Sequence, residues 1–280
     1  MRVAITGANG LFGHGLVTAF SSGHTVFPLT RADADITDAE SVRAALERNR
    51  PEVVVHSAGI PDLDIADADP ARADSVNAGG TRHVVEASQA VRAKVVYIST
   101  DAVFDGKNTR PYVESDRPAP ITVYGRTKLA GEAFVQTQRQ YWIFRVPVLF
   151  GPGKTNFVEK GLRKIAAGEQ YVTASDQMGC AAYTLDMAYK IMEVVEARRY
   201  GLYHLANQGV CTRYELARRA AELAGLDPGK VVGIPADQMG RRAPRLKYAV
   251  LEMAALRAAG ISSPRPWQEA LADYIRTLSL

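Results

Sequence analysis

The chain has 280 residues, of which 47% are apolar and 23% are charged, values typical of a globular enzyme with a sizeable core. Its formal charge of +4 is spread along the sequence, and no basic stripe with interleaved aromatic residues indicates a nucleic-acid partner. We therefore expect a small anionic ligand rather than a polyanion.

Four further absences bear on compartment and class. Cys180 and Cys211 are far apart and match no metal-ligand spacing, so we expect no disulfide framework and a cytoplasmic location. No carboxylate cluster indicates a metal, and we expect none to be required. A glycine loop already begins at Gly7, which argues against a signal peptide. No apolar run approaches the ~18 residues that span a bilayer, so no membrane partner is expected.

Strands and helices are predicted to alternate through the first half of the chain. Apolar runs predict strands at 3–5, 24–29, 53–55, 94–99 and 141–149. Helices are expected between them, at 70–90 and around Tyr124 among others. Thr37 and Glu40 have the spacing of a capping box, which predicts the start of a helix that ends near Asn49. This alternation predicts an α/β fold with a doubly wound parallel sheet of the Rossmann type.

The pattern changes after Gly151-Pro152-Gly153, where loops rich in Gly, Pro and Asp separate helical stretches. The helices are expected at 156–168, 184–198, 212–224, 250–259 and 267–278. We interpret 1–152 as a dinucleotide-binding domain and 153–280 as mostly a smaller substrate-binding lobe. Segment 184–207 is the candidate for a return to the sheet.

The glycine loop at 7–13 has the spacing G-x-x-G-x-x-G between the first strand and the first helix. Glycines at these positions permit a tight turn, a close approach to a pyrophosphate and close packing of helix on strand. The helix N-terminus adds free N–H groups and a positive dipole end. The loop predicts a dinucleotide site, with contacts from Gly7, Asn9, Gly10, Leu11, Phe12 and Gly13.

The residue that follows the second strand indicates which nicotinamide cofactor is preferred. An acidic residue there would accept hydrogen bonds from the ribose 2′-hydroxyl, whereas an arginine pairs with a 2′-phosphate. This strand ends Leu29-Thr30-Arg31, with no acid before Asp33. Arg31 therefore favours NADPH, with NADH as the alternative.

Tyr124 and Lys128 stand four residues apart, one helical turn, in V-Y-G-R-T-K. This spacing alone carries little weight. Thr100, however, ends the strand V-V-Y-I-S-T, and ligands of a doubly wound sheet bind at the carboxyl ends of its strands. The dinucleotide loop, the strand-end hydroxyl and the Tyr-x-x-x-Lys helix are therefore expected at one edge of the sheet.

Together these features resemble the short-chain dehydrogenase/reductase superfamily, in the extended branch that acts on nucleotide sugars. Within that branch the chain is similar to the dTDP-4-dehydrorhamnose reductases. The stretches that carry the resemblance are T-G-A-N-G-L-F-G, S-T-D-A-V-F-D-G, V-Y-G-R-T-K-L-A-G-E, D-Q-M-G, A-P-R-L-K-Y-A-V-L-E and R-P-W-Q-E-A-L. They run in this order from residue 6 into the C-terminal helix.

The resemblance implies an NADPH-dependent reductase of the ketone of a nucleotide-linked sugar. Tyr124 would donate the proton, Lys128 would supply positive charge and hold the nicotinamide ribose, and Thr100 would orient the carbonyl. For acid–base work near neutrality the pKa of Tyr124 would have to fall from ~10 to roughly 7. The resemblance also implies a homodimer.

The remaining site residues are also implied by the resemblance. The expected cofactor contacts are Asp35 and Ile36 at the adenine and Ala58, Gly59 and Ile60 beside the phosphates and ribose. The expected substrate contacts are Thr100, Asp101, Val148, Asn156, Gln177 and Arg245, the last of them near a diphosphate.

Two departures from the family pattern put the natural substrate in question. Ala102 stands where the family usually has an aromatic residue after S-T-D, and Val148 stands where a tryptophan usually lines the sugar pocket. A substrate other than the usual 6-deoxy-4-ketohexose is therefore expected, unless Phe104 or Phe150 supplies the missing aromatic contact.

Two alternatives to the reductase stay open. Val148 and its neighbours also resemble the methionine adenosyltransferase regulatory subunit, a non-catalytic NADP-binding protein on the same fold. The intact set of Thr100, Tyr124 and Lys128 favours the enzyme over this alternative. A dehydratase or epimerase is disfavoured because Asp101 is followed by Ala102 rather than by the glutamate of the dehydratase pair.

Overall fold

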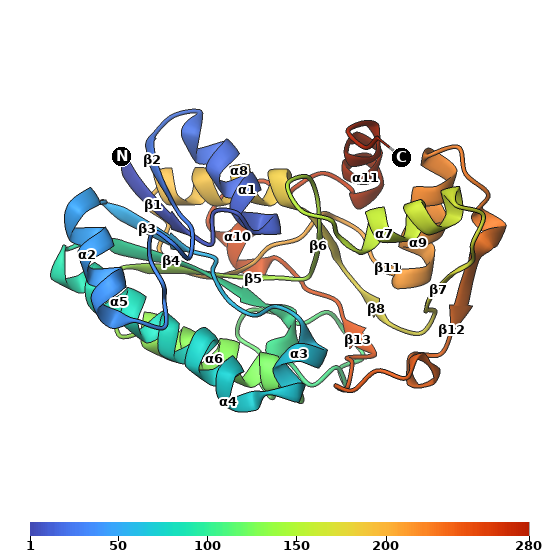
Figure 1. Cartoon of the computed structure of the whole chain (residues 1–280), viewed down its shortest axis with the longest axis horizontal. Coiled ribbons are helices and arrows are strands. Elements are labelled where there is room, and N and C mark those ends of the chain that lie inside the picture. Colours follow the sequence, from blue (N-terminus) through green and yellow to red (C-terminus); the bar gives the residue numbers. More distant parts are fainter. Residues whose placement is uncertain (280) are drawn as a thin grey trace.

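The computed structural model describes residues 1–279 and is built around one six-stranded, all-parallel sheet (Figure 1). Its strand order is β10-β5-β4-β3-β1-β2. The strands are β1 (Arg2–Thr6), β2 (Thr25–Leu29), β3 (Val53–His56), β4 (Lys94–Thr100), β5 (Tyr141–Val146) and β10 (Gly201–His204). Since β2 and β3 lie on opposite sides of β1, the direction of winding reverses there. The predicted Rossmann-type fold is confirmed.

Helices cover both faces of the sheet (Figure 1). One face packs against α1 (Leu11–Ser21), α8 (Thr184–Glu196) and the short α10 (Ala254–Ala258). The other packs against α2 (Ala39–Asn49), α5 (Gly80–Ala90) and α6 (Val123–Val135). Every residue of β3 is buried, as expected for a strand covered on both faces.

Two element boundaries differ from the sequence predictions. The N-cap of α2 is Asp38, whose carboxylate accepts the Glu40 N–H at 3.0 Å, so the predicted Thr37–Glu40 capping box is wrong. Thr37 instead donates its hydroxyl to Asp35. The expected strand 141–149 is two strands, because Pro147 has no N–H to continue the pairing with β4.

The expected helix at 70–90 contains a rare change of winding. It begins as α4 (Pro70–Asp74), continues as the π-helical turn η1 (Ser75–Gly79) and becomes α5. A short helix, α3 (Leu63–Ala68), precedes it. The π-turn places Asn77 in a buried position between the loop after β3 and α6, and such turns often occur at functional sites.

The second lobe has its own core and lies beyond the carboxyl ends of the strands (Figure 1). Its helices are α7 (Phe157–Ala166), α9 (Arg213–Leu223) and α11 (Trp267–Arg276). Short strands pair in three small sheets: β6 (Val148–Phe150) with β9 (Ala181–Tyr183); β7 (Tyr171–Ala174) with β12 (Val231–Ile234); and β8 (Met178–Gly179) with both β11 (Cys211–Thr212) and β13 (Tyr248–Ala249). The chain returns to the first lobe between β9 and β11, where it forms α8 and β10. Within residues 1–279, no helix is long and apolar enough to cross a bilayer.

Candidate active site

A cleft of about 1160 Å³ separates the carboxyl ends of the strands from the second lobe. Nearly all of the predicted site residues line it. They are Gly7, Asn9, Gly10, Leu11, Phe12, Gly13, Arg31, Asp35, Ile36, Ala58, Gly59, Ile60, Thr100, Asp101, Tyr124, Lys128, Val148, Gln177 and Arg245. The topology therefore brings segments that are far apart in sequence to one edge of the sheet.

The glycine loop has the geometry of a phosphate cradle. Gly7 has a φ of +68°, and a Cβ there would lie 2.8 Å from the Ala58 backbone. A Cβ on Gly13 would lie 2.0 Å from the Gly7 carbonyl oxygen, so only glycine allows α1 to pack this close. Gly10 is the N-cap of α1 and provides no side-chain cap, which leaves the first N–H groups of the helix to bind an anion. These features fit the pyrophosphate of a dinucleotide.

Arg31 lies just beyond β2, where the sequence places the cofactor-selecting residue. Its side chain is 78% exposed, and its Nε donates to Asp35 at 3.0 Å. Asp35 also accepts the Thr37 N–H and hydroxyl, and these bonds lower its pKa most, with Arg31 adding to the effect. Only Nε of the guanidinium is engaged, so the two terminal nitrogens of Arg31 can meet a phosphate.

Asn77 holds the loop at 58–60 against α6. Its Oδ1 accepts the Ile60 N–H at 2.7 Å, and its Nδ2 donates to the Ile60 carbonyl and to the Thr127 hydroxyl. A Cβ on Gly59 would lie 2.8 Å from Asn77 Oδ1, so the loop passes too close for a larger residue. Asn77 is thus a polar bridge between this loop and α6.

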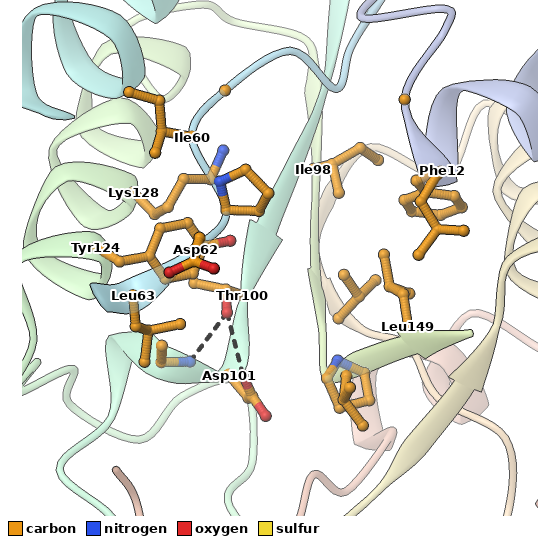
Figure 2. A pocket seen from close by; sticks show the side chains of 18 of the residues that line it. Phe12, Ile60, Asp62, Leu63, Ile98, Thr100, Asp101, Tyr124, Lys128 and Leu149 are labelled. Atoms are coloured by element: carbon orange, nitrogen blue, oxygen red, sulfur yellow. Dashed lines mark hydrogen bonds between the residues drawn. The ribbon is translucent and has the colours of Figure 1, made fainter. Parts of the chain in front are cut away.

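Tyr124 and Lys128 project from the first turns of α6 toward Thr100 and Asp101 at the end of β4 (Figure 2). Thr122 caps α6 by accepting the Gly125 N–H at 2.9 Å, which fixes where the helix begins. Gly125 lets α6 lie against the β4 end, since a Cβ there would be 2.0 Å from the Ala102 carbonyl. The predicted trio of Thr100, Tyr124 and Lys128 thus shares one wall of the cleft.

Burial moves the pKa values of the tyrosine and the lysine in opposite directions. It raises the pKa of Tyr124 to about 12 and lowers that of Lys128 to about 7, against the opposing effect of Glu132. The expectation of a lowered tyrosine pKa is therefore wrong for this structure, because desolvation of the phenolate outweighs the lowering effect of the nearby Thr100 hydroxyl. A phenol that stays protonated at neutral pH is the form that can donate a proton.

A buried ion pair lies one helical turn beyond Lys128. Glu132 accepts two bonds from the Arg145 guanidinium, at 2.9 and 2.8 Å, and a third from the Ser99 hydroxyl. Both charged side chains are at most 3% exposed. Lys128 itself lies over the Tyr97 ring, 4.0 Å from its centroid. This network ties α6 to β4 and β5 and limits how far Lys128 can move.

Asp101 follows Thr100 and faces the cleft (Figure 2). Thr100 Oγ1 donates to the Asp101 carboxylate at 3.0 Å and accepts the Ala102 N–H at 3.1 Å. Burial raises the pKa of Asp101 to about 6, although Arg213 and the Thr100 hydroxyl act against the rise. The Thr100 hydroxyl therefore donates its proton to a carboxyl group that titrates near pH 6.

Three sequence expectations about the substrate side need correction. Asn156 does not line the cleft: it caps α7 and donates to the Gly151 carbonyl and the Tyr274 hydroxyl. Phe104 and Phe150 are fully buried in separate cores, so neither replaces the aromatic residues absent at Ala102 and Val148.

Phe157, Tyr171 and Arg213 line the second-lobe wall, and sequence reasoning missed all three. The only available signal was the pattern T-R-Y-E, a capping box that places Arg213 at the start of a helix.

Arg245 lines the cleft but is already paired. Its Nη2 donates to Asp64 at 2.8 Å and its Nη1 to the Ala243 carbonyl at 2.8 Å. Its predicted contact with a diphosphate stays a prediction. Among residues 1–279 no group of three or more His, Cys, Asp or Glu side chains could hold a metal ion, and Cys180 and Cys211 are free, buried thiols.

A dinucleotide loop and a Tyr-x-x-x-Lys helix on one cleft define the class, an oxidoreductase of the extended short-chain dehydrogenase/reductase type. The family described as "RmlD substrate binding domain" matches residues 1–280. The chain belongs to the RmlD substrate-binding domain family, and the resemblance seen in the sequence is confirmed.

Relatives match the chain over nearly its whole length. Spore coat polysaccharide biosynthesis protein SpsK of Bacillus subtilis is 34% identical over 99% of this chain and 98% of its own. A dTDP-4-dehydrorhamnose reductase of Mycolicibacterium smegmatis is 36% identical over 98% of this chain and 85% of its own. The crystal structure of dTDP-4-dehydrorhamnose reductase from Bacillus anthracis in complex with NADP has a TM-score of 0.95, with 34% identity and 99% of both chains covered.

Proposed function

We propose that the protein is an NADPH-dependent reductase of the ketone group of a nucleotide-linked sugar. The observation that carries this proposal is the meeting of Thr100, Tyr124 and Lys128 with the glycine loop on a single cleft. The family and the NADP complex of a relative support it. A purely regulatory NADP-binding protein would need no proton donor beside its cofactor site.

Three residues of the chain have separate roles in the reduction. When bound, NADPH would supply a hydride to the ketone carbon. Tyr124 would give its phenolic proton to the ketone oxygen, so the product would be an alcohol. Thr100 orients that oxygen by a hydrogen bond. Lys128, when protonated, stabilises the phenolate that remains on Tyr124 until solvent returns the proton.

Residues of the first lobe would hold the cofactor. Gly10 and the N–H groups that open α1 would bind the pyrophosphate, and Arg31 would meet the 2′-phosphate. Asp35 and Ile36 would border the adenine, while Ala58 to Ile60 would lie beside the phosphates and ribose. Lys128 would hold the nicotinamide ribose.

The sugar pocket is bounded by Asp101, Val148 and Gln177. Ala102 and Val148 give less contact area than aromatic side chains, so the substrate is a sugar other than the 6-deoxy-4-ketohexose of dTDP-4-dehydrorhamnose. About 100 Å² of lost contact corresponds to roughly 2.5 kcal/mol.

Absorbance of NADPH, followed across a panel of nucleotide ketosugars, tests both the function and the substrate. The proposed function predicts that NADPH is oxidised in the presence of at least one ketosugar of the panel. Tight NADPH binding without turnover on any member would favour the regulatory alternative. A kcat/KM above about 10⁵ M⁻¹s⁻¹ for dTDP-4-dehydrorhamnose would show that the proposal of a different sugar substrate is wrong.

The proposal also covers the domain organisation, the location and the oligomeric state of the protein. Residues 1–152 with the returning segment 184–207 form the cofactor-binding unit, and the rest of 153–280 forms the substrate lobe. The two free thiols accord with a cytoplasmic location. The protein acts as a homodimer, which sedimentation equilibrium would test.

A further inference from the structure

Tyr97 is a fully buried aromatic residue of β4 that packs against α6. Its ring lies next to the Lys128 side chain, with 4.0 Å between the ring centroid and Nζ. Its hydroxyl donates to the Lys128 carbonyl at 3.3 Å. Gly131 makes room for this contact, since a Cβ there would collide with the Tyr97 hydroxyl. Tyr97 thus contacts both the backbone and the charged end of one active-site residue.

The ring face of Tyr97 is the one direct partner of the Lys128 ammonium in the described chain, residues 1–279. Lys128 is only 5% exposed, and its Nζ makes no hydrogen bond and no ion pair with those residues. Burial of an ammonium without a carboxylate partner favours its neutral form. The face of an aromatic ring is negative and attracts a cation within about 6 Å of the centroid. The ring therefore opposes the loss of the proton from Lys128.

The charges around Lys128 have other partners. The titratable and charged groups on the neighbouring elements are Tyr124, Glu132, Asp101, His56, Arg145 and Asp62. Glu132 accepts two bonds from Arg145, and burial lowers the pKa of Lys128 more than Glu132 raises it. Asp62 caps α3, and Asp101 accepts the hydroxyl of the residue before it. The direct contact with the ammonium is therefore left to the aromatic ring.

His56 supports the ring of Tyr97 from the adjacent strand. The two residues are register partners of β3 and β4, and their rings stack with centroids 5.6 Å apart and planes at 26°. Thr81 Oγ1 donates its own proton to a carbonyl, so it accepts from Nε2 of His56 at 3.1 Å, and Thr6 donates to Nδ1 at 2.7 Å. Burial, with the charge of Lys128 adding to it, lowers the pKa of His56 to about 3. His56 therefore stays neutral and adds no second positive charge beside the ring.

We propose that Tyr97 is a positioning residue of the active site, whose ring holds the Lys128 side chain in place and in its charged form. The inference rests on the proposed function, in which protonated Lys128 stabilises the phenolate left on Tyr124. Tyr97 does not line the cleft, so it acts through Lys128. A neutral lysine would fill the same space but would leave that phenolate without a counter-charge in a buried site.

Fluorination of the ring separates its charge distribution from its shape. Phenylalanine with no, one, two or three fluorine atoms at position 97 fills similar space, but each fluorine withdraws negative charge from the ring face. The NMR signal of the isotope-labelled Lys128 ε-carbon, assigned with Lys128→Met, reports the pKa of Lys128 in the cofactor-free protein. Tyr97→Phe should keep this pKa within about 0.3 of the parent value, and the trifluorinated ring should lower it by about 1, as expected of a desolvated cation–π contact.

Tyr97→Leu removes the ring altogether and should also lower the pKa of Lys128 by about 1. Phe144→Leu is the matched control, because it opens a similar cavity in the core on the other face of the sheet and should leave that pKa unchanged. With a ketosugar that the parent reduces, the pH above which kcat/KM falls should move down together with the pKa of Lys128, since the protonated lysine is the active form. Tyr97→Phe should retain the parent profile.

Two outcomes would overturn the inference. One is a Lys128 pKa that does not depend on the number of fluorine atoms at position 97. The other is an equal fall of this pKa in Tyr97→Leu and Phe144→Leu, which would mean that packing alone is responsible. The NMR titration requires no turnover, so it decides the inference separately from the proposed function, which would fail if the parent reduced no ketosugar.

Discussion

The two walls of the cleft are held in different ways. On the first-lobe wall, Lys128 is buried, and Glu132 and Asn77 behind it bond to groups on neighbouring elements. On the second-lobe wall, Arg213 and Arg241 are half-buried or exposed and have bonding capacity left. A network of bonds between neighbouring elements fixes the reacting groups in place, whereas free donors can adapt to a ligand.

This difference assigns separate tasks to the two walls. Tyr124 and its helix α6 are positioned by contacts within the first lobe. The proton transfer therefore does not depend on the position of the second lobe. The cationic side chains of the second wall, Arg213 and Arg241, come from α9 and from the loop before β13, so their positions depend on the packing of the second lobe. Substitutions on the first wall should therefore reduce turnover or stability, and those on the second should reduce affinity.

The largest effect is expected for Tyr124→Phe, which removes one proton and little else. The value of kcat should fall about a thousandfold, within the range that general acid catalysis contributes, while NADPH affinity stays within twofold. Tyr189→Phe, an exposed tyrosine on α8, is the matched control. Turnover in the Tyr124 variant equal to that of the parent would remove this residue from the mechanism.

The network behind the first wall is tested by Glu132→Ala, which leaves the Arg145 guanidinium buried without its partner. The free energy of unfolding should fall by about 3 kcal/mol. Glu222→Ala breaks the exposed Arg219–Glu222 pair and should cost less than about 1 kcal/mol. Urea unfolding measures both. Equal losses would mean that the buried pair has no special part in holding this wall.

The residues of the first wall could be predicted from the sequence more completely than those of the second wall. Gly7, Tyr124 and Lys128 were predictable because they act through local geometry, a turn and a helical repeat, on elements whose order sets the sheet. The π-turn that positions Asn77 left no signal in the sequence.

Residues of the second wall lacked such a signal. Arg213 and Tyr171 reach the cleft through tertiary packing of short strands, which periodicity does not show. Asn156 was assigned to the substrate, although an asparagine before a helix has a local partner in the free N–H groups of that helix. Pro147 could have been read as the end of a strand, since it removes a donor.

A smaller effect is expected from pH, because Asp101 has a pKa raised to about 6 by burial. When ionised, its carboxylate competes with the ketone for the single proton of the Thr100 hydroxyl. Protonation of Asp101 as the pH falls through about 6 should release that proton to the ketone and raise kcat/KM about fivefold, the value of one hydrogen bond.

Lys128, with a pKa lowered to about 7, titrates in the same range, and its protonation also favours the reaction at lower pH. Asp101→Asn separates the two groups: it should abolish the step near pH 6 and keep the one near pH 7. A profile of kcat/KM against pH that is identical in parent and variant would show that Asp101 does not share the Thr100 proton. Tyr124 stays protonated across this range, because its pKa is about 12.

The smallest effect is expected at Arg31. This residue belongs to the first lobe, but its side chain is exposed, as that of Arg241 is on the second wall. Its side chain is 78% exposed and shares its charge with Asp35, so its bond to a 2′-phosphate should contribute less than about 1 kcal/mol. Arg31→Ala should therefore reduce the preference for NADPH over NADH about threefold, whereas Asp35→Asn, which frees the guanidinium, should increase it. Arg43→Ala, an exposed arginine of α2 that does not line the cleft, should leave the preference unchanged. Fluorescence titration with both cofactors measures the ratio, and equal affinities for NADPH and NADH in the parent protein would show that Arg31 does not select the cofactor.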